Sequence, residues 1–279
     1  MRRPLTVAQL RNLARRVAQG ERSEQDRELV AEDLVALGYD RSGAQRIVTL
    51  LSQTEQLSWY VTKGKRKGCY PVTRVSQGYP RRLRQKLGLD APGCLWAKGD
   101  IRLLEETSVS LVGSRELERE NENFAKELGK QAALQGYVLV SGNARGADRT
   151  AQDACLAHGG KVICVVADEL GEQPEKENVL FLSEEGFDLP FSAPRALSRN
   201  RIIHSLSERT FVAQCTYGRG GTWNGTAHNL QKMFSQVFCF RDGSDAVREL
   251  CQRGAEQIFT EDLQNIQALP MHIKSLIDQ

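Results

Sequence analysis

Several features that would place a chain in a broad class are missing from this 279-residue sequence. No apolar run approaches the ~18 residues of a membrane-spanning helix, and the basic residues 1–4 lead into a polar segment and not into a secretory core. The seven cysteines include no Cys-x-x-Cys pair, and no His–Cys cluster has the spacing of metal ligands. We therefore expect a cytoplasmic protein with free, mostly buried thiols, no bound metal and no membrane partner.

Negative charge is absent from residues 56–89, although the chain as a whole carries a formal net charge of only +3. Aromatic side chains alternate there with lysines and arginines, which is typical of a surface where bases stack and phosphates pair. The alternative is a solvated face with no ligand. Glycines and a proline within residues 64–71 predict a hairpin or an extended connector instead of a helix. The aromatic residues are Trp59, Tyr60, Tyr70 and Tyr79, and the cations of this secondary basic surface are Lys63, Lys65, Arg66, Lys67, Arg81, Arg82 and Arg84.

The centre of the chain has the pattern of a parallel sheet. Three short apolar runs, 109–112, 137–140 and 162–167, are rich in β-branched residues, as strands buried on both faces are. Between them, residues 123–135 and 148–158 have the composition of helices, and each segment is followed by glycine. An order of strand, helix, strand, helix, strand predicts an α/β fold with right-handed crossovers.

Small polar residues and an arginine follow the first two strands, in Gly113-Ser114-Arg115 and in residues 141–146. Ligands of open α/β sheets bind at the carboxyl ends of the strands. Glycines there let backbone N–H groups approach an anion, and arginines favour a phosphate. The alternative is a pair of tight turns with solvated arginines, but two such turns on one sheet edge favour the anion site.

Arginines recur in residues 199–201, Arg-Asn-Arg, which precede apolar residues at helical spacing. If Ser198 caps that helix, both arginines lie on its first turn, where the helix macrodipole disfavours cations. A bound anion would offset this repulsion. A second possibility, compatible with the first, is that one arginine pairs with a glutamate at 184–185.

Together, these three motifs occur in the order and spacing of the DprA/Smf DNA-processing family, which the chain resembles from about residue 79 to residue 243. The resemblance implies a Rossmann-like, mostly parallel sheet flanked by helices and preceded by a small helical N-terminal domain. It also implies that the protein binds single-stranded DNA, helps to load a RecA-type recombinase during natural transformation, and forms a homodimer. It implies no cofactor and no catalytic residue.

The residues that would hold backbone phosphates come from the three motifs and from a further glycine-rich turn after residues 210–215. That turn departs from the family, in which a serine-glycine loop usually precedes Thr-Ala; here only Thr226-Ala227 matches clearly. The candidate phosphate and DNA contacts are Gly113, Ser114, Arg115, Ser141, Gly142, Asn143, Arg145, Gly146, Arg199, Asn200, Arg201, Gly220, Gly221 and Thr222.

Four segments are expected along the chain: a small helical domain over residues 1–55, a basic connector over 56–78, a DprA-like Rossmann domain over 79–264 and a short tail over 265–279. Three short helices with capping residues are expected in the first segment. The remaining strands of the sheet are expected near residues 94–98, 178–184, 210–215 and 236–240.

Two other classes of function stay open. One is a sensor or an enzyme that acts on a free nucleotide in the same Rossmann pocket, which Gly220-Gly221-Thr222 and the polar Asn143 favour. Its weakness is the lack of an acid–base pair, because Asp148 is the only acidic residue inside a recognised motif and can cap the helix that follows. The other is a structural module that binds a protein partner, which the arginine-rich motifs disfavour.

Overall fold

One nine-stranded sheet organises the part of the chain that the structure, a computed structural model, describes: residues 9, 12, 16, 29–74 and 76–272. Its strand order is β1-β2-β6-β5-β4-β3-β7-β8-β9. Neighbours are parallel from β6 to β9, whereas β2 pairs antiparallel with β6 and β1 with β2. The strands are β1 (Tyr70–Thr73), β2 (Cys94–Lys98), β3 (Ser108–Val112), β4 (Val138–Ser141), β5 (Lys161–Val165), β6 (Val179–Ser183), β7 (Arg209–Val212), β8 (Gln236–Phe240) and β9 (Glu256–Ile258).

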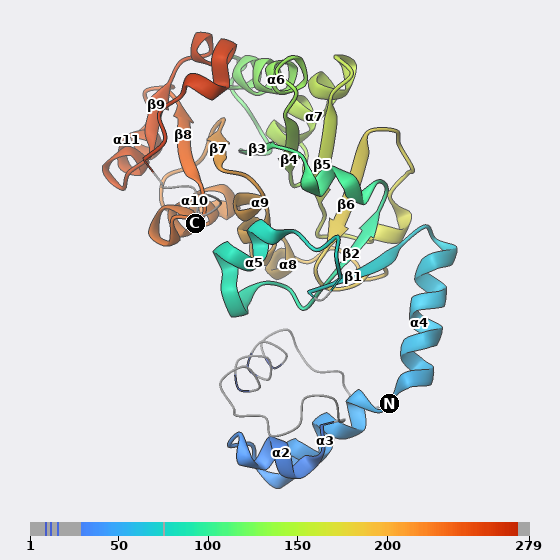
Figure 1. Cartoon of the computed structure of the whole chain (residues 1–279). Helices are drawn as coiled ribbons and strands as arrows, with labels where there is room; N and C mark the ends of the chain where they lie inside the picture. The colour runs from blue at the N-terminus through green and yellow to red at the C-terminus, as the bar shows by residue number, and fades with distance from the viewer. Residues whose placement is uncertain (1–8, 10–11, 13–15, 17–28, 75, 273–279) are drawn as a thin grey trace.

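Helices cover both faces of this sheet, so the predicted α/β fold is confirmed (Figure 1). α6 and α7 pack on one face, and α5, α9, α10 and α11 pack on the other. The α-helices in the described residues are α2 (Ala31–Ala36), α3 (Arg41–Leu51), α4 (Thr54–Arg66), α5 (Arg81–Leu87), α6 (Arg119–Leu134), α7 (Ala147–Ala157), α8 (Ala193–Ser198), α9 (Asn200–Leu206), α10 (Gly220–Lys232) and α11 (Asp245–Gln252).

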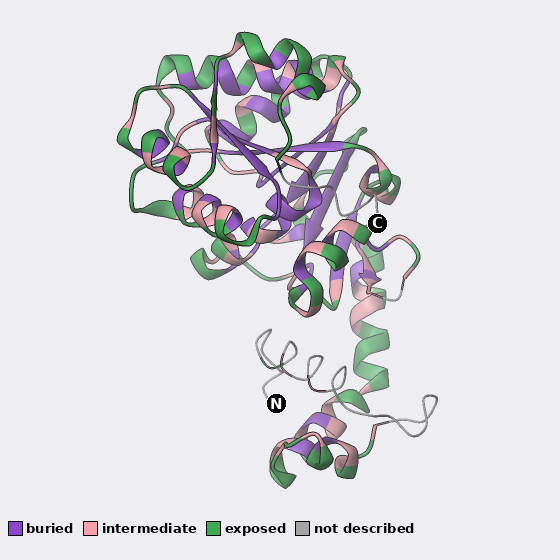
Figure 2. Ribbon diagram, turned by 60° about the vertical axis from the view of Figure 1, so that its left-hand side comes forward, coloured by how far each residue is buried: buried purple, intermediate pink, exposed green. Residues whose placement is uncertain are grey.

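The core has two layers, one on each face of the sheet, because successive side chains of a strand point to opposite faces. In β4, Val138 and Val140 belong to the core layer that includes residues of α5, α9 and α10, whereas Leu139 belongs to the layer with α6 and α7. Figure 2 shows the central strands buried along their length. This burial explains the continuous apolar runs in the sequence, since strands covered on both faces show no polar alternation.

A separate small apolar group, which includes Leu34 and Ala44, holds α2 and α3 together. The Asp40 carboxylate caps α3 by accepting a hydrogen bond from the Gly43 N–H at 2.9 Å. The third of the predicted N-terminal helices is therefore confirmed as α3, and the second is confirmed in part, as the shorter helix α2. Most of the first helix, and the capping box at Ser23, lie outside the described residues.

The hairpin or extended connector predicted over residues 59–79 is wrong for residues 59–66, because α4 is a continuous helix that ends at Arg66 and joins α3 to the sheet (Figure 1). Beyond the helix, the extended strand β1 pairs antiparallel with β2. Gly64 lies inside this helix and faces the core. A Cβ at Gly64 would lie 2.5 Å from the Trp96 ring and 3.2 Å from the Phe187 ring. The glycine therefore permits close packing of a helix against the sheet and does not mark a turn.

Gly64→Ala is expected to destabilise the fold. Overpacking against Trp96 costs about 1–3 kcal/mol, which exceeds the gain in helix propensity of up to about 1 kcal/mol. Urea unfolding followed by circular dichroism would measure the difference. Gly93→Ala is the matched control, since a Cβ at Gly93 meets no atom within 4 Å. If the two variants were equally stable, the tight contact with Trp96 would carry no energetic weight.

All seven cysteines are free and five are buried, as predicted. Burial raises the pKa of the Cys164 thiol to about 12, so this thiol stays protonated at neutral pH. Across the described ranges, no His, Cys, Asp and Glu side chains gather in threes that could hold a metal ion. No helix in those ranges combines the length and apolarity that crossing a membrane requires.

Candidate functional site

Two adjoining cavities lie at the carboxyl ends of the parallel strands, beside the amino ends of α7, α9 and α10. The larger cavity has a volume of about 680 Å³ and the smaller a volume of about 430 Å³. Arg115, Phe191 and Arg199 belong to the walls of both. Open α/β sheets bind their ligands at this edge, so the position favours a binding site.

Hydrogen bonds between three segments of the chain fix the walls of the larger cavity. The Thr222 hydroxyl donates to the Gly113 carbonyl at 2.9 Å, which ties the glycine-rich turn to the end of β3. The Asn200 side-chain amide donates to the Gly221 carbonyl at 3.0 Å, which ties the same turn to α9. All four residues line the cavity, so the first, third and glycine-rich motifs meet there as expected.

Arg199 is the buried cation of the site. Its side chain is only 8 % exposed, yet among the described residues its guanidinium forms no hydrogen bond and no ion pair, and its Nε has no partner atom. A Cβ at Gly142 would lie 1.6 Å from Nη1 of Arg199, so the guanidinium covers the backbone of that glycine. A buried guanidinium with unused donors in a cavity wall is suited to an anion.

Asp148 holds the second motif in shape. Its carboxylate accepts hydrogen bonds from the Gly142 N–H at 3.0 Å and from the Ala144 N–H at 3.1 Å. Burial raises the pKa of the Asp148 carboxyl, while the positive charge of Arg199 and these two hydrogen bonds act to lower it. Burial also lowers the pKa of the Arg199 guanidinium, and the charge of Asp148 opposes that change. Asp148 therefore stabilises the loop and the buried cation.

Exposed arginines surround the buried one. Arg115 and Arg219 line the larger cavity, and Arg115 and Arg145 line the smaller one. None of the three forms an ion pair with a described residue. Four guanidinium groups, including that of Arg199, therefore lie at one edge of the sheet, and none forms an ion pair with a described residue.

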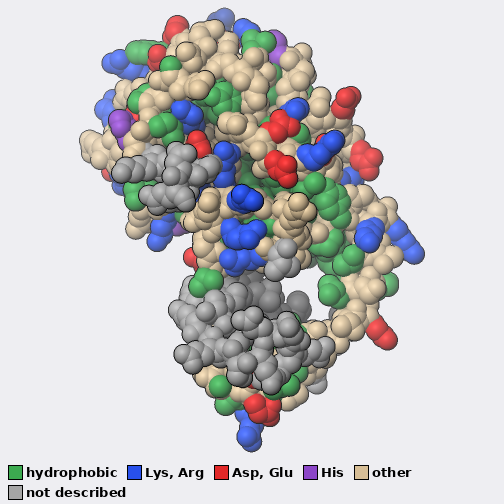
Figure 3. Space-filling view, in the orientation of Figure 1, with side chains coloured by type: hydrophobic (Ala, Val, Ile, Leu, Met, Phe, Trp, Pro, Cys, Tyr) green, Lys and Arg blue, Asp and Glu red, His purple; other side chains and the backbone are tan. Residues whose placement is uncertain are grey.

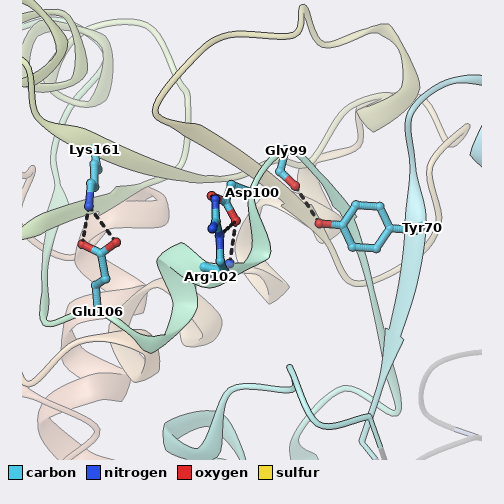
Figure 4. Close-up of polar contacts among 6 residues, drawn as sticks. All are labelled: Tyr70, Gly99, Asp100, Arg102, Glu106 and Lys161. Atoms are coloured by element: carbon cyan, nitrogen blue, oxygen red, sulfur yellow. Dashed lines mark hydrogen bonds and ion pairs between the residues drawn. The ribbon is translucent and has the colours of Figure 1, made fainter.

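The opposite edge of the sheet shows the contrasting arrangement (Figure 4). Lys161, at the start of β5, lies 2.8 Å from the Glu106 carboxylate, and Arg102 lies 2.6 Å from the Asp100 carboxylate. Lys161 and Arg102 are thus neutralised within the protein. Arg115, Arg145, Arg199 and Arg219, at the carboxyl ends of the strands, form no ion pair with a described residue, which favours an anionic ligand there.

Three predicted contact residues lie outside both cavities. The Ser141 hydroxyl is buried and accepts a hydrogen bond from Gln152. Gly146 allows a close backbone approach, since a Cβ there would lie 2.4 Å from the Arg115 carbonyl oxygen. Arg201 was expected in the same concavity, and this placement is wrong: its guanidinium pairs with the buried Glu184.

Ser198 also departs from its predicted role. Ser192 is the N-cap of α8, and Arg199 occupies the N-cap position of α9. The Ser198 hydroxyl instead donates to the Glu184 carboxylate at 2.7 Å. One of the two arginines does pair with a glutamate, as the second possibility held, while Arg199 stays in the cavity.

Two prominent residues of the site were missed by sequence reasoning. Arg219 directly precedes Gly220 and Gly221, so its place beside a predicted ligand turn was a usable signal. Phe191 lies in a loop of no regular pattern, and nothing in the sequence marks it. The remaining predicted residues of the second motif, Gly142, Asn143 and Arg145, line the smaller cavity.

The cations of the secondary basic surface fall into two groups, those in ion pairs and those without an ion pair to a described residue. Figure 3 shows Lys and Arg side chains gathered over α5 on one face of the molecule. Three of the seven predicted cations are neutralised by ion pairs, and four form none with a described residue. The pairs are Lys63–Asp188, Lys67–Glu172 and Arg82–Glu208, and the cations without an ion pair are Lys65, Arg66, Arg81 and Arg84.

Most aromatic side chains of this segment are structural. Tyr79 is buried, and the Tyr60 ring packs against Trp96 while its hydroxyl donates to Asp188. The Tyr70 hydroxyl donates to the Gly99 carbonyl at 2.6 Å (Figure 4). Trp59, which is 64 % exposed, is the one exposed ring of the four, and the Lys63 ammonium lies 5.5 Å from its centroid.

The chain is similar in sequence to proteins of one known family. The model of the family described as DNA recombination-mediator protein A matches residues 71–270. DNA processing protein DprA of Streptococcus pneumoniae is 33 % identical over 187 compared residues, in a match that covers 61 % of this chain and 64 % of that protein. Protein Smf of Escherichia coli is 28 % identical over 210 compared residues, in a match that covers 69 % of this chain and 55 % of the relative. The matched region thus spans less than two thirds of either relative.

Solved structures agree with the fold. The crystal structure of DprA from Streptococcus pneumoniae matches with a TM-score of 0.75 and 26 % identity, and the match covers 91 % of each chain. A structure of DNA processing protein A from Helicobacter pylori, described for its unique single-stranded DNA binding mode, matches with a TM-score of 0.60 and 23 % identity. That match covers 71 % of this chain and 94 % of the other.

Proposed function

This chain belongs to the DNA recombination-mediator protein A family, and on that premise we propose that it binds single-stranded DNA and mediates DNA processing and recombinase loading in transformation or related DNA metabolism. The backbone phosphates of the strand bind in the two cavities at the carboxyl edge of the sheet. No residue is assigned a catalytic role, because the Asp148 carboxylate, the only one in the recognised motifs, accepts hydrogen bonds from the backbone of its own loop.

One observation carries the proposal: Arg115, Arg145, Arg199 and Arg219 face two adjoining cavities and form no ion pair with a described residue. Guanidinium groups bind phosphates through two parallel hydrogen bonds, a geometry that suits them to nucleic-acid backbones. A single nucleotide would engage one cluster of these cations, whereas a strand that spans both cavities engages all four. The electrostatic arrangement therefore favours a polymer.

A free nucleotide in the larger cavity is the second candidate. A volume of about 680 Å³ falls within the roughly 300–1,000 Å³ of small-molecule sites. The ring of Phe191 and the polar groups of the glycine-rich turn would suit a base and a sugar. This candidate leaves Arg145, which lines only the smaller cavity, without a role.

Affinity is expected to rise steeply with oligonucleotide length and to level off within the ~4–16 nucleotides of single-strand sites. Calorimetry with a series from thymidine monophosphate to long oligothymidylate would measure this dependence. A duplex of equal length is the comparison ligand, and the protein is expected to prefer the single strand. Tight binding of the mononucleotide with no gain from added length would instead support the nucleotide-binding candidate.

Membership of this family favours two protein partners, a RecA-type recombinase and a second copy of this chain. Sedimentation velocity would establish the oligomeric state with and without oligonucleotide. A recombinase-loading role is supported if this protein, but not a variant that has lost DNA binding, accelerates filament formation on a single strand coated with a single-strand-binding protein.

A further inference from the structure

Phe191 is an exposed aromatic ring in the wall that the two cavities share. It is 54 % exposed and lies on the segment 184–192 between β6 and α8. The Arg115 guanidinium lies 5.8 Å from the centroid of its ring, within reach of a cation–π contact. One exposed ring is common on protein surfaces. What distinguishes Phe191 is how firmly the segment that carries it is held.

Arg195, in the first turn of α8, holds this segment in place. Its side chain is buried, with 8 % of the residue exposed, and it lines neither cavity. Every hydrogen bond of its guanidinium goes to the 184–192 segment or to the ends of β5 and β6. Nη1 donates to the carbonyls of Ala167, Leu189 and Pro190 at 2.9, 2.8 and 2.7 Å, Nη2 donates to the Ser183 hydroxyl at 3.1 Å, and Nε lies 3.5 Å from the Glu185 carboxylate.

These contacts fix the residue directly before Phe191. The Pro190 and Leu189 carbonyls are tied to the Ala167 carbonyl, at the end of β5, through one guanidinium nitrogen. Burial of a guanidinium is unfavourable unless its donors are satisfied, and here they are satisfied by the backbone that must be held. A binding group works best when the residues behind it lock its position.

We propose that Arg195 is a positioning residue that holds Phe191 between the two cavities, so that a single strand crosses the site with its bases unstacked on either side of the ring. This inference rests on the proposed function. An aromatic ring stacks on any unpaired base, and a duplex cannot open its stack to admit the ring without losing base pairing. The Phe191 ring would thereby contribute to the preference for single strands.

Phe191→Ala is expected to weaken binding of a short oligothymidylate about 10-fold, because one stacking contact is lost. The dependence of affinity on salt should stay unchanged, since no phosphate contact is removed. Arg195→Met is expected to weaken binding to a similar extent, although Arg195 cannot reach the ligand. Arg195→Lys, which keeps the charge but loses the fork of donors, should share the defect in milder form.

The decisive comparison is between the affinity of the double variant Phe191→Ala with Arg195→Met and that of Phe191→Ala alone. If Arg195 acts through the ring, the double variant binds no more weakly than Phe191→Ala alone. If Arg195 matters only for folding, affinities of the folded fraction stay at the wild-type level while the midpoint of unfolding falls. A 2-aminopurine base in the oligonucleotide gives a second readout: its fluorescence change on binding should be lost in Phe191→Ala and in Arg195→Met, and reduced in Arg195→Lys.

Phe259→Ala is the matched control. Phe259 is similarly exposed, has the Arg241 guanidinium 5.1 Å from its ring, and lines neither cavity. Its substitution should leave affinity and 2-aminopurine fluorescence as in the wild type. Wild-type affinity in Phe191→Ala would overturn the inference while leaving the proposed function intact. Failure of the wild type itself to bind single strands would instead overturn the proposed function.

Discussion

The variant that combines Arg115→Ala, Arg199→Ala and Arg219→Ala is expected to lose about 1,000-fold in affinity for a single-stranded oligonucleotide. Each charge-assisted hydrogen bond to a phosphate is worth at least about 1.4 kcal/mol, or tenfold. The three guanidinium groups share one cavity and form no ion pair with a described residue. The slope of log affinity against log salt should therefore fall by about 2, at ~0.7 per phosphate contact.

Fluorescence titrations at several salt concentrations would measure both quantities. The single variants should each lose about tenfold and ~0.7 in slope. Arg102→Ala is the control, because Arg102 lies at the opposite edge of the sheet and pairs with Asp100 (Figure 4). An unchanged slope in the triple variant would remove these arginines from the phosphate contacts, whatever the loss of affinity.

Separating Arg201 from Glu184 is expected to cost about 3–5 kcal/mol of unfolding free energy. The Glu184 side chain is 5 % exposed, so Arg201→Met leaves a buried carboxylate without this cation. Glu184→Gln leaves the guanidinium without this anion. The double variant Glu184→Gln with Arg201→Met removes both charges at once and should recover most of the stability, since buried ion pairs contribute little net free energy.

Urea unfolding of the two single variants and the double variant completes the thermodynamic cycle. Oligonucleotide titration under conditions where every variant is folded tests the assignment of the two neighbouring arginines. Arg201→Met should keep the wild-type salt slope, whereas Arg199→Ala should lose ~0.7. A reduced slope in Arg201→Met would return Arg201 to the phosphate contacts.

Strands of the sheet could be predicted closely because their signal is local. The runs at 94–98, 178–184 and 236–240 correspond to β2, β6 and β8 within a residue. Strands covered on both faces need uninterrupted apolar residues, and few other environments demand this. The position of the binding site could be predicted by the same argument, because the turns that follow parallel strands all lie at one edge of the sheet.

Predictions failed where a residue type serves a distant partner. Gly64 had the composition of a turn, but its small size fits the Trp96 ring, which lies far along the sequence. Arg199 and Arg201 share a motif, yet one enters the cavity and the other pairs with Glu184, because positions two apart on a helix do not face the same way. Tyr60 and Tyr79 resembled stacking residues, but Tyr79 is buried in the core and Tyr60 is partly buried against Trp96.

The contact between Arg199 and Gly142 has a consequence for how this site can change. The guanidinium occupies the place that a side chain at position 142 would take, so any such side chain displaces the cation. Substitution of Gly142 thus imitates loss of Arg199 without altering a single charged residue. The effects of substitutions at the two positions, which lie on different elements of the fold, therefore depend on each other. A search for altered ligand preference in laboratory evolution can vary the exposed arginines one at a time, but it must vary this pair together.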